Sequence, residues 1–199
     1  MKKIILCATM MLFSLMSVFA QSSSVISPES LEGKWKIGEG FRAILQSAMN
    51  EEGEGRDLQV DYILDFGKNN SVSIIIPMQG SEEGQDFTME FSIPGTYTLK
   101  GNTINLELNK ENISIKITDI KSDDPELKKL MENPKSRDAL LLMMSSMIEE
   151  EMKSEMKDIS SLVDGFASMS VQSVTDTQLK LKFGEKDIKV AVTFERLDK

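Results

Sequence analysis

The sequence contains no histidine, and its only cysteine is Cys7, near the N-terminus. A chain that loses its first twenty residues therefore has neither imidazoles nor thiols. This excludes disulfide frameworks, thiol catalysis, serine–histidine triads and zinc sites built on histidine or cysteine. The stability of such a chain must come from burial of an apolar core.

Basic residues are also scarce, with 23 lysines and arginines against 32 acidic residues and a net charge of −9. Lys2 and Lys3 belong to the first twenty residues, and without them the net charge is −11. Nucleic-acid binding depends on clustered lysine and arginine that release counterions from phosphates. The acidic balance therefore predicts no nucleic-acid partner, and otherwise it indicates only solubility.

Residues 1–20 have the pattern of a secretory signal peptide. The two lysines precede an almost continuous apolar run over residues 4–19, and Ala20 supplies the small residue before a predicted cleavage at Gln21. The run is too short for a membrane anchor, so we expect no stable membrane insertion after cleavage. Cys7 is not placed like the acylated cysteine of a lipoprotein. The sequence predicts export to the periplasm or the cell exterior, with residues 21–199 as one domain.

Alternation of apolar and polar residues is the main structural signal in the remaining chain. It marks about ten segments in which every second residue is apolar, as in a strand with one buried face. The clearest segments are 58–66, 87–93, 104–108, 113–117, 179–183 and 188–194, and the shorter ones are 35–37, 72–76, 97–99 and 169–174. Short turns rich in glycine, asparagine and aspartate join them, which favours an antiparallel meander.

A sheet of this kind must cover its own apolar face. Closure into a barrel does so and also removes the sheet edges. We therefore predict a mainly β fold, a barrel of about eight to ten strands, with a two-sheet sandwich as the structural alternative. Two acidic stretches, 51–57 and 81–86, are predicted to be solvated loops, because their spacing matches no calcium loop.

A helical insert is predicted at about residues 125–165, between the seventh and eighth strands. Asp124 and Pro125 begin a short helix, and Ser136 begins a longer one that ends at Gly165. One face of the longer helix carries Leu140, Met144, Met147, Ile148, Met152, Met156, Ile159 and Val163. This stripe has two interpretations: an adjustable lid over the barrel mouth, because methionine adapts to varied apolar partners, or ordinary packing on the sheet.

The stretch LEGKWKI, residues 31–37, and the long meander after it resemble the secreted bacterial lipocalin-like domains that begin Leu-x-Gly-x-Trp after a signal peptide. The resemblance rests on Gly33 and Trp35 and covers nearly all of the chain after the signal. It implies that Trp35 closes the floor of a lipocalin-like barrel. It also implies that Arg196, after the last strand, packs over the indole in a cation–π contact. The chain departs from typical lipocalins in lacking the Thr-Asp-Tyr motif and in placing its helices before the last strands.

Two functions are consistent with these patterns. The first is a non-enzymatic carrier of a small apolar, lipid-like ligand, because the traced interior positions hold no charged residue. The expected site residues are Met144, Met147 and Met152 in the lid, with Tyr62 and Phe91 in the lumen. The alternative is a cell-envelope or surface interaction module with a filled barrel and a docking helix.

The available carboxylates, hydroxyls and lysines show no spacing that would converge in a catalytic pocket. We therefore expect no enzymatic activity, no cofactor and no metal. The sequence leaves the oligomeric state open.

Overall fold

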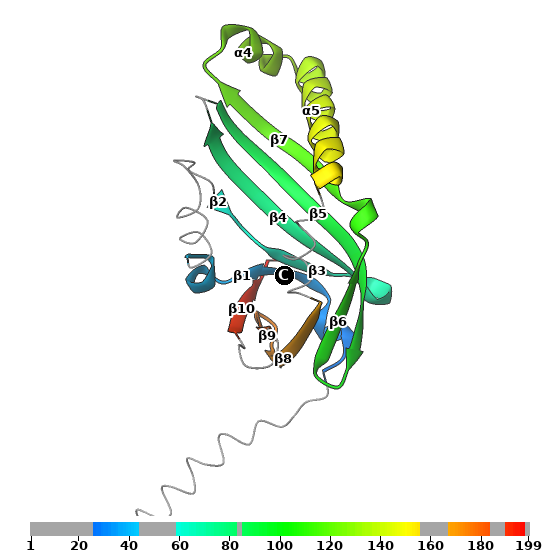
Figure 1. Ribbon diagram of the computed structural model, residues 1–199. Helices are drawn as coiled ribbons and strands as arrows, with labels where there is room; N and C mark the ends of the chain where they lie inside the picture. Colours follow the sequence, from blue (N-terminus) through cyan, green and yellow to red (C-terminus); the bar gives the residue numbers. More distant parts are fainter. Residues whose placement is uncertain (1–25, 44–58, 83–84, 156–166, 184–189, 198–199) are drawn as a thin grey trace, which may run out of the picture.

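The computed structural model describes residues 26–43, 59–82, 85–155, 167–183 and 190–197, with the backbone alone described over 151–155 (Figure 1). The strands are β1 (Gly33–Ile37), β2 (Gln59–Val60), β3 (Ile63–Phe66), β4 (Ser71–Glu82), β5 (Gln85–Lys100), β6 (Thr103–Leu108), β7 (Ser114–Ser122), β8 (Ser168–Val174), β9 (Gln178–Phe183) and β10 (Val190–Arg196). The α-helices with both ends in the described ranges are α2 (Pro28–Leu31), α4 (Pro125–Glu132) and α5 (Pro134–Glu155); residues 39–43 are also helical, and two short 3-10 turns are η1 (Lys68–Asn70) and η2 (Lys110–Asn112).

Eight of the strands form a closed antiparallel barrel. Their order is β4-β3-β1-β10-β9-β8-β6-β5, and pairing between β5 and β4 closes the ring. Hairpins join β3 to β4, β4 to β5, β5 to β6, β8 to β9 and β9 to β10, as a meander requires. The prediction of a mainly β fold that closes into a barrel is confirmed, and the two-sheet sandwich is wrong.

The two longest strands extend beyond this ring. β4 has 12 residues and β5 has 16, and their outer halves pair with β2 on one side and β7 on the other. Figure 1 shows β4, β5 and β7 continuing together away from the barrel. The predicted loop at 81–86 is wrong in its extent, because β4 continues to Glu82 and β5 begins at Gln85. The side chain of Asp86, at the start of β5, is exposed to solvent.

A proline divides the strand predicted over 58–66 into β2 and β3. The pairing register with β4 is the same in both pieces, but Asp61 lies opposite Pro77 at the division. The Asp61 N–H donates to the Pro77 carbonyl (3.0 Å), and proline has no N–H to return the bond. At the next residue, the Tyr62 carbonyl accepts from the N–H of Ile37 in β1 (2.8 Å). The chain therefore turns at this point from the outer sheet into the barrel.

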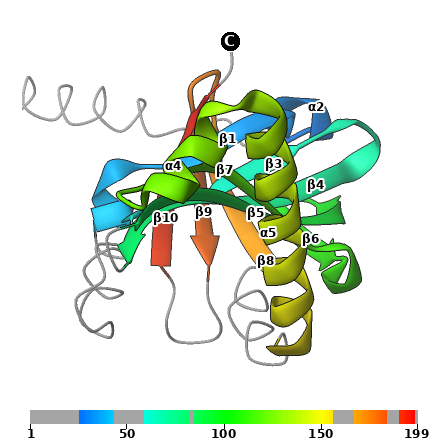
Figure 2. The same ribbon diagram turned by 90° about the horizontal axis from the view of Figure 1, so that it is seen from above.

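The helical insert lies between β7 and β8, as predicted. Asp124 caps α4 through the N–H groups of Glu126 and Leu127, with Pro125 in the first turn. Asn133 ends α4 and caps α5 through Lys135 and Ser136, so α5 begins at Pro134 rather than at Ser136. Figure 2 shows both helices over one side of the strands, and the main helix–sheet contact is between α5 and β7.

Several predictions concern residues outside the described ranges. These are the signal at 1–20, the first acidic stretch, and the part of the long helix after Glu155. None of the helices in the described ranges has the length and apolar composition that a membrane span requires.

Candidate functional site

Trp35 and Arg196 lie together at one end of the barrel. Their Cα positions are paired between β1 and β10, and the guanidinium carbon of Arg196 is 4.2 Å from the centre of the indole. Trp35 has no exposed surface. The structure therefore brings together the two side chains that the lipocalin resemblance pairs.

The short helix α2 completes this end of the barrel. The Trp35 indole N–H donates to the Leu31 carbonyl (2.6 Å). Arg196 donates from Nη1 to the Glu32 carbonyl (2.8 Å) and from Nη2 to the Ser30 carbonyl (3.3 Å). The arginine thus satisfies carbonyls that the helix end leaves free, in addition to its stacking on the indole. This end is a structural floor.

Gly33 is required at this floor for two reasons. Its φ of +120° lies where side chains are rarely tolerated, and a Cβ at this position would lie 2.9 Å from Nη1 of Arg196. The glycine of the Gly-x-Trp motif therefore makes room for the arginine that covers the tryptophan.

The barrel interior above the floor is packed core. Phe66 and Tyr97 make an edge-to-face contact with ring centres 5.1 Å apart, and both are almost fully buried. Phe91, predicted to line a lumen, is 3% exposed and belongs to the same cluster as Trp35. In this half the described side chains behave as a filled barrel, not as an open lumen.

Tyr62, the other predicted lumen residue, is half-buried and packs against the edge of this core. Burial raises the pKa of its hydroxyl above the ordinary value of 10.0. The pKa of Tyr97 is also raised, first by burial and then by the negative charges of Glu32 and Glu29. Both phenols therefore remain neutral under physiological conditions.

A second apolar cluster lies between the helices and β7. Its buried members are Ile117, Ile120 and Leu141. Around them pack side chains that are only partly buried: Met89, Leu127, Met131, Met144 and Ile148. Ile148 also packs against the barrel core, so the apolar interior continues from the barrel to the underside of α5. We call this second cluster the insert layer.

Ser145 joins α5 to the sheet within the insert layer. It is 7% exposed, and its hydroxyl accepts the N–H of Ile117 (2.9 Å) while donating to the Leu141 carbonyl (2.7 Å). The pairing of β7 with β5 is irregular next to Ile117, and β7 has no second neighbour in the described sheet. The serine thus supplies an acceptor to an edge strand. Serine in an apolar helix gave no sequence signal for this role.

The predicted methionine lid divides between two faces of α5. Met144 is partly buried against the insert layer. Met147 is 62% exposed, so its assignment to the inward face is wrong. A straight helix that turns Leu141, Met144, Ser145 and Ile148 toward the sheet turns Met147 away from it. The side chain of Met152 lies outside the described residues.

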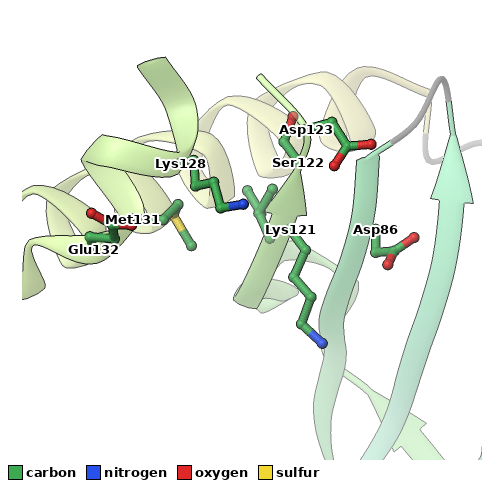
Figure 3. A pocket seen from close by; sticks show the side chains of 8 residues that line it. Asp86, Lys121, Ser122, Asp123, Lys128, Met131 and Glu132 are labelled. Carbon is green, nitrogen blue, oxygen red and sulfur yellow. The ribbon is translucent and has the colours of Figure 1, made fainter. Parts of the chain in front are cut away.

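A cleft of about 590 Å³ opens beside the insert layer, between α4 and the ends of β7 and β5. Its lining is Asp86, Ile120, Lys121, Ser122, Asp123, Lys128, Met131 and Glu132. Figure 3 shows Lys128 and Met131 extending from α4 toward β7, while Lys121 and Asp86 point away from the helix. Ile120 and Met131 belong to both the cleft and the insert layer, so the cleft is a polar-rimmed opening to that layer.

A larger cleft of about 800 Å³ lies on the outer face of the sheet. In its wall Asp61 pairs with Lys36 (2.8 Å) and with Arg42 (3.6 Å). These contacts are an ion-pair network in which both cations neutralise one carboxylate. Among the described residues, no three acidic, histidine or cysteine side chains gather as metal ligands would.

Comparison with known proteins adds no assignment. No protein-family model matches the chain. No curated protein matches its sequence significantly.

Proposed function

We propose that this chain is an exported, non-enzymatic, lipocalin-like protein that binds a small apolar ligand at the barrel mouth, beneath α4 and α5. The stacked Trp35 and Arg196 pair supports the lipocalin resemblance. The observation that carries the binding proposal is the insert layer, a methionine-rich and only partly buried cluster that opens into the cleft of Figure 3.

The contrast between the two clusters locates the ligand. The floor half of the barrel is a packed core whose largest side chains are fully buried, so entry there would require displacement of many contacts. On one of its sides, the insert layer is covered by α4 and α5 alone among the described elements. Met89, Met131 and Met144 can change rotamer at little cost to make room for an apolar chain. We therefore place the ligand under the helices instead of deep in the lumen.

The cleft gives this ligand its expected chemistry. An apolar tail would contact Ile120 and Met131, and a small head group would lie among the charged side chains of the rim. The rim has both signs of charge, with Lys121 and Lys128 beside Asp86, Asp123 and Glu132. A neutral or zwitterionic head group suits this mixture better than a strongly acidic one.

The test is a fluorescence titration of the chain from Gln21 onward, which contains every described element. The probe is N-phenyl-1-naphthylamine, a neutral apolar fluorophore, and energy transfer from Trp35 reports its binding. We expect saturation at one site per chain and displacement by lipids. Met144→Gln should weaken binding about tenfold, because it places an amide without partners in the apolar layer.

Met147→Gln is the matched control, since it is the same substitution one turn away on the outer face of α5. It should leave the probe affinity unchanged. Absence of saturable binding, or equal effects of the two variants, would refute a site beneath the helices. A fatty alcohol that competes better than the fatty acid of equal length would support a neutral head group.

A second candidate function is a cell-envelope or surface interaction module. The specific observation in its favour is the apolar surface that α5 exposes away from the sheet, where Leu142, Met143 and Met147 are 69%, 55% and 62% exposed. The two functions use different faces of one helix and can be tested separately.

A further inference from the structure

Helix α5 has a second apolar face that nothing in the described structure covers. Ala139, Met143 and Met147 follow one another at one-turn intervals, all three are exposed, and we call them the outer stripe; Leu142 is exposed on a flank of the same stretch. The inward face is already occupied by Leu141, Met144 and Ile148 against the sheet. Single exposed apolar residues are common on protein surfaces, but three large ones on one stretch of helix indicate an interaction surface.

The charges around the outer stripe indicate which partner fits. Lys135 precedes the stripe, as do Arg137 and Asp138, which pair with each other (3.5 Å), so the end before the stripe has one basic charge in excess, and Glu149 and Glu150 follow it. A partner helix that is basic at its N-terminal end and acidic at its C-terminal end, and that packs antiparallel to α5, would bring opposite charges together at both ends. A second copy of α5 has this order of charges. An anionic membrane surface does not suit the acidic end of the helix or the net charge of −9.

We infer that two copies of the chain associate through antiparallel contact of their α5 outer stripes. With the two-fold axis near Leu142 and Met143, Ala139 of one copy lies near Met147 of the second copy. The small alanine leaves space for the long methionine, so the helices can approach closely. The same alignment places Lys135 near Glu150 of the second copy, twice in the dimer. Such an isologous contact follows the commonest symmetry of homo-oligomers.

The contact is small, so the association should be weak. Three large apolar side chains per copy with a polar rim fall below the roughly 1,200 Å² of total buried surface that stable complexes need. We therefore expect a reversible dimer with a dissociation constant on the order of 100 µM. The inference does not depend on the proposed ligand site, because Met144 and the insert layer lie on the other side of α5.

Sedimentation velocity of the chain from Gln21 onward, at loadings from about 5 to about 500 µM, measures this equilibrium. The double variant Met143→Gln, Met147→Gln should raise the dissociation constant at least tenfold. Val190→Gln, which removes an exposed apolar side chain on β10, should leave it unchanged. Circular dichroism and Trp35 emission identify any variant that fails to fold.

Charge exchange tests the antiparallel arrangement directly. Lys135→Glu should raise the dissociation constant several-fold, because it places like charges opposite each other twice. The double variant Lys135→Glu, Glu150→Lys should restore the dimer, since the opposite charges meet again. A chain that stays monomeric at the highest loading overturns the inference. So does a dimer that the methionine variants leave intact, a double exchange that does not restore association, or vesicle binding through the stripe without dimers.

Discussion

Substitution of Ser145 tests how the helical insert is held to the barrel. Ser145→Ala removes the hydroxyl that accepts the buried Ile117 N–H and donates to the Leu141 carbonyl. Among the described residues Ser145 is the acceptor paired with that N–H, and Ile117 is 4% exposed. The substitution therefore leaves a buried donor on an edge strand without a partner, while the volume of the side chain changes by only one oxygen.

The two lost bonds differ in their cost. The Leu141 carbonyl already accepts the normal helical bond, so its loss of the serine proton costs little. The Ile117 N–H loses its partner in a buried position, which costs about 1–3 kcal/mol. Alanine has the better helix propensity, by roughly 0.5 kcal/mol. The free energy of unfolding should thus fall by about 0.5–2.5 kcal/mol, which corresponds to a Tm lower by roughly 1–10 °C for a chain of this size.

Urea denaturation followed by circular dichroism measures this change. Ser146→Ala is the matched control, because Ser146 is exposed and its hydroxyl donates only to the Leu142 carbonyl of its own helix (3.0 Å). The control should be neutral or slightly stabilising. Amide hydrogen exchange should also quicken at Ile117 in Ser145→Ala. Equal stability of the two variants would mean that the serine does not anchor α5 to β7, and the reasoning would be wrong.

Two further predictions concern the floor and the buried phenols. Arg196→Lys keeps the charge but loses the guanidinium group that reaches two carbonyls, so it should lower the free energy of unfolding by about 1–2 kcal/mol, with a larger loss in Arg196→Ala. Urea unfolding followed by Trp35 emission measures both changes. An Arg196→Lys variant as stable as the original chain would contradict the geometry. Burial raises the folded pKa of Tyr62 and Tyr97, so their contribution to stability is complete below pH 10 and is lost as the pH rises through the raised values. Tyr97→Phe should weaken this alkaline loss and leave neutral-pH stability unchanged or up to about 1 kcal/mol higher, because the Tyr97 hydroxyl has no partner among the described residues. Absorbance at alkaline pH and urea midpoints measure the two effects, and a clear loss of stability at neutral pH in Tyr97→Phe would show that the hydroxyl is bonded.

The barrel could be predicted from the sequence because its signal is repeated and local. Each strand with one apolar face requires a cover, and short turns leave antiparallel neighbours as the simple solution. The exceptions come from interactions that are not local. Pro77 divides the strand opposite it by withholding an N–H, although its own strand continues. The acidic composition of the stretch 81–86 predicts a loop, yet Ser81 and Asp86 pair within one long hairpin.

The candidate site was only partly predictable, for a different reason. The pairing of Trp35 with Arg196 could be expected because a family resemblance supplied a partner far away in the sequence. Ser145 could not be found, because its value depends on one unpaired N–H in a strand 28 positions earlier. The opening beside Met131 depends on where the short helix α4 settles against β7, which no residue pattern specifies.

The two faces of α5 show why a methionine stripe is a weak guide to function. Apolar residues at 141, 142, 143, 144, 147 and 148 cover most of the helix circumference, so spacing alone does not choose the inward side. The sheet makes the choice through the apolar contacts of Leu141, Met144 and Ile148 and through the bond of Ser145 to Ile117 on the same face. With that rotation Met144 turns inward and Met147 outward. Without the serine bond, the rotation of α5 relative to the sheet should be less fixed. In Ser145→Ala both the probe affinity and the self-association should therefore change. Simultaneous change of two activities that use different surfaces would indicate that one hydroxyl orients both.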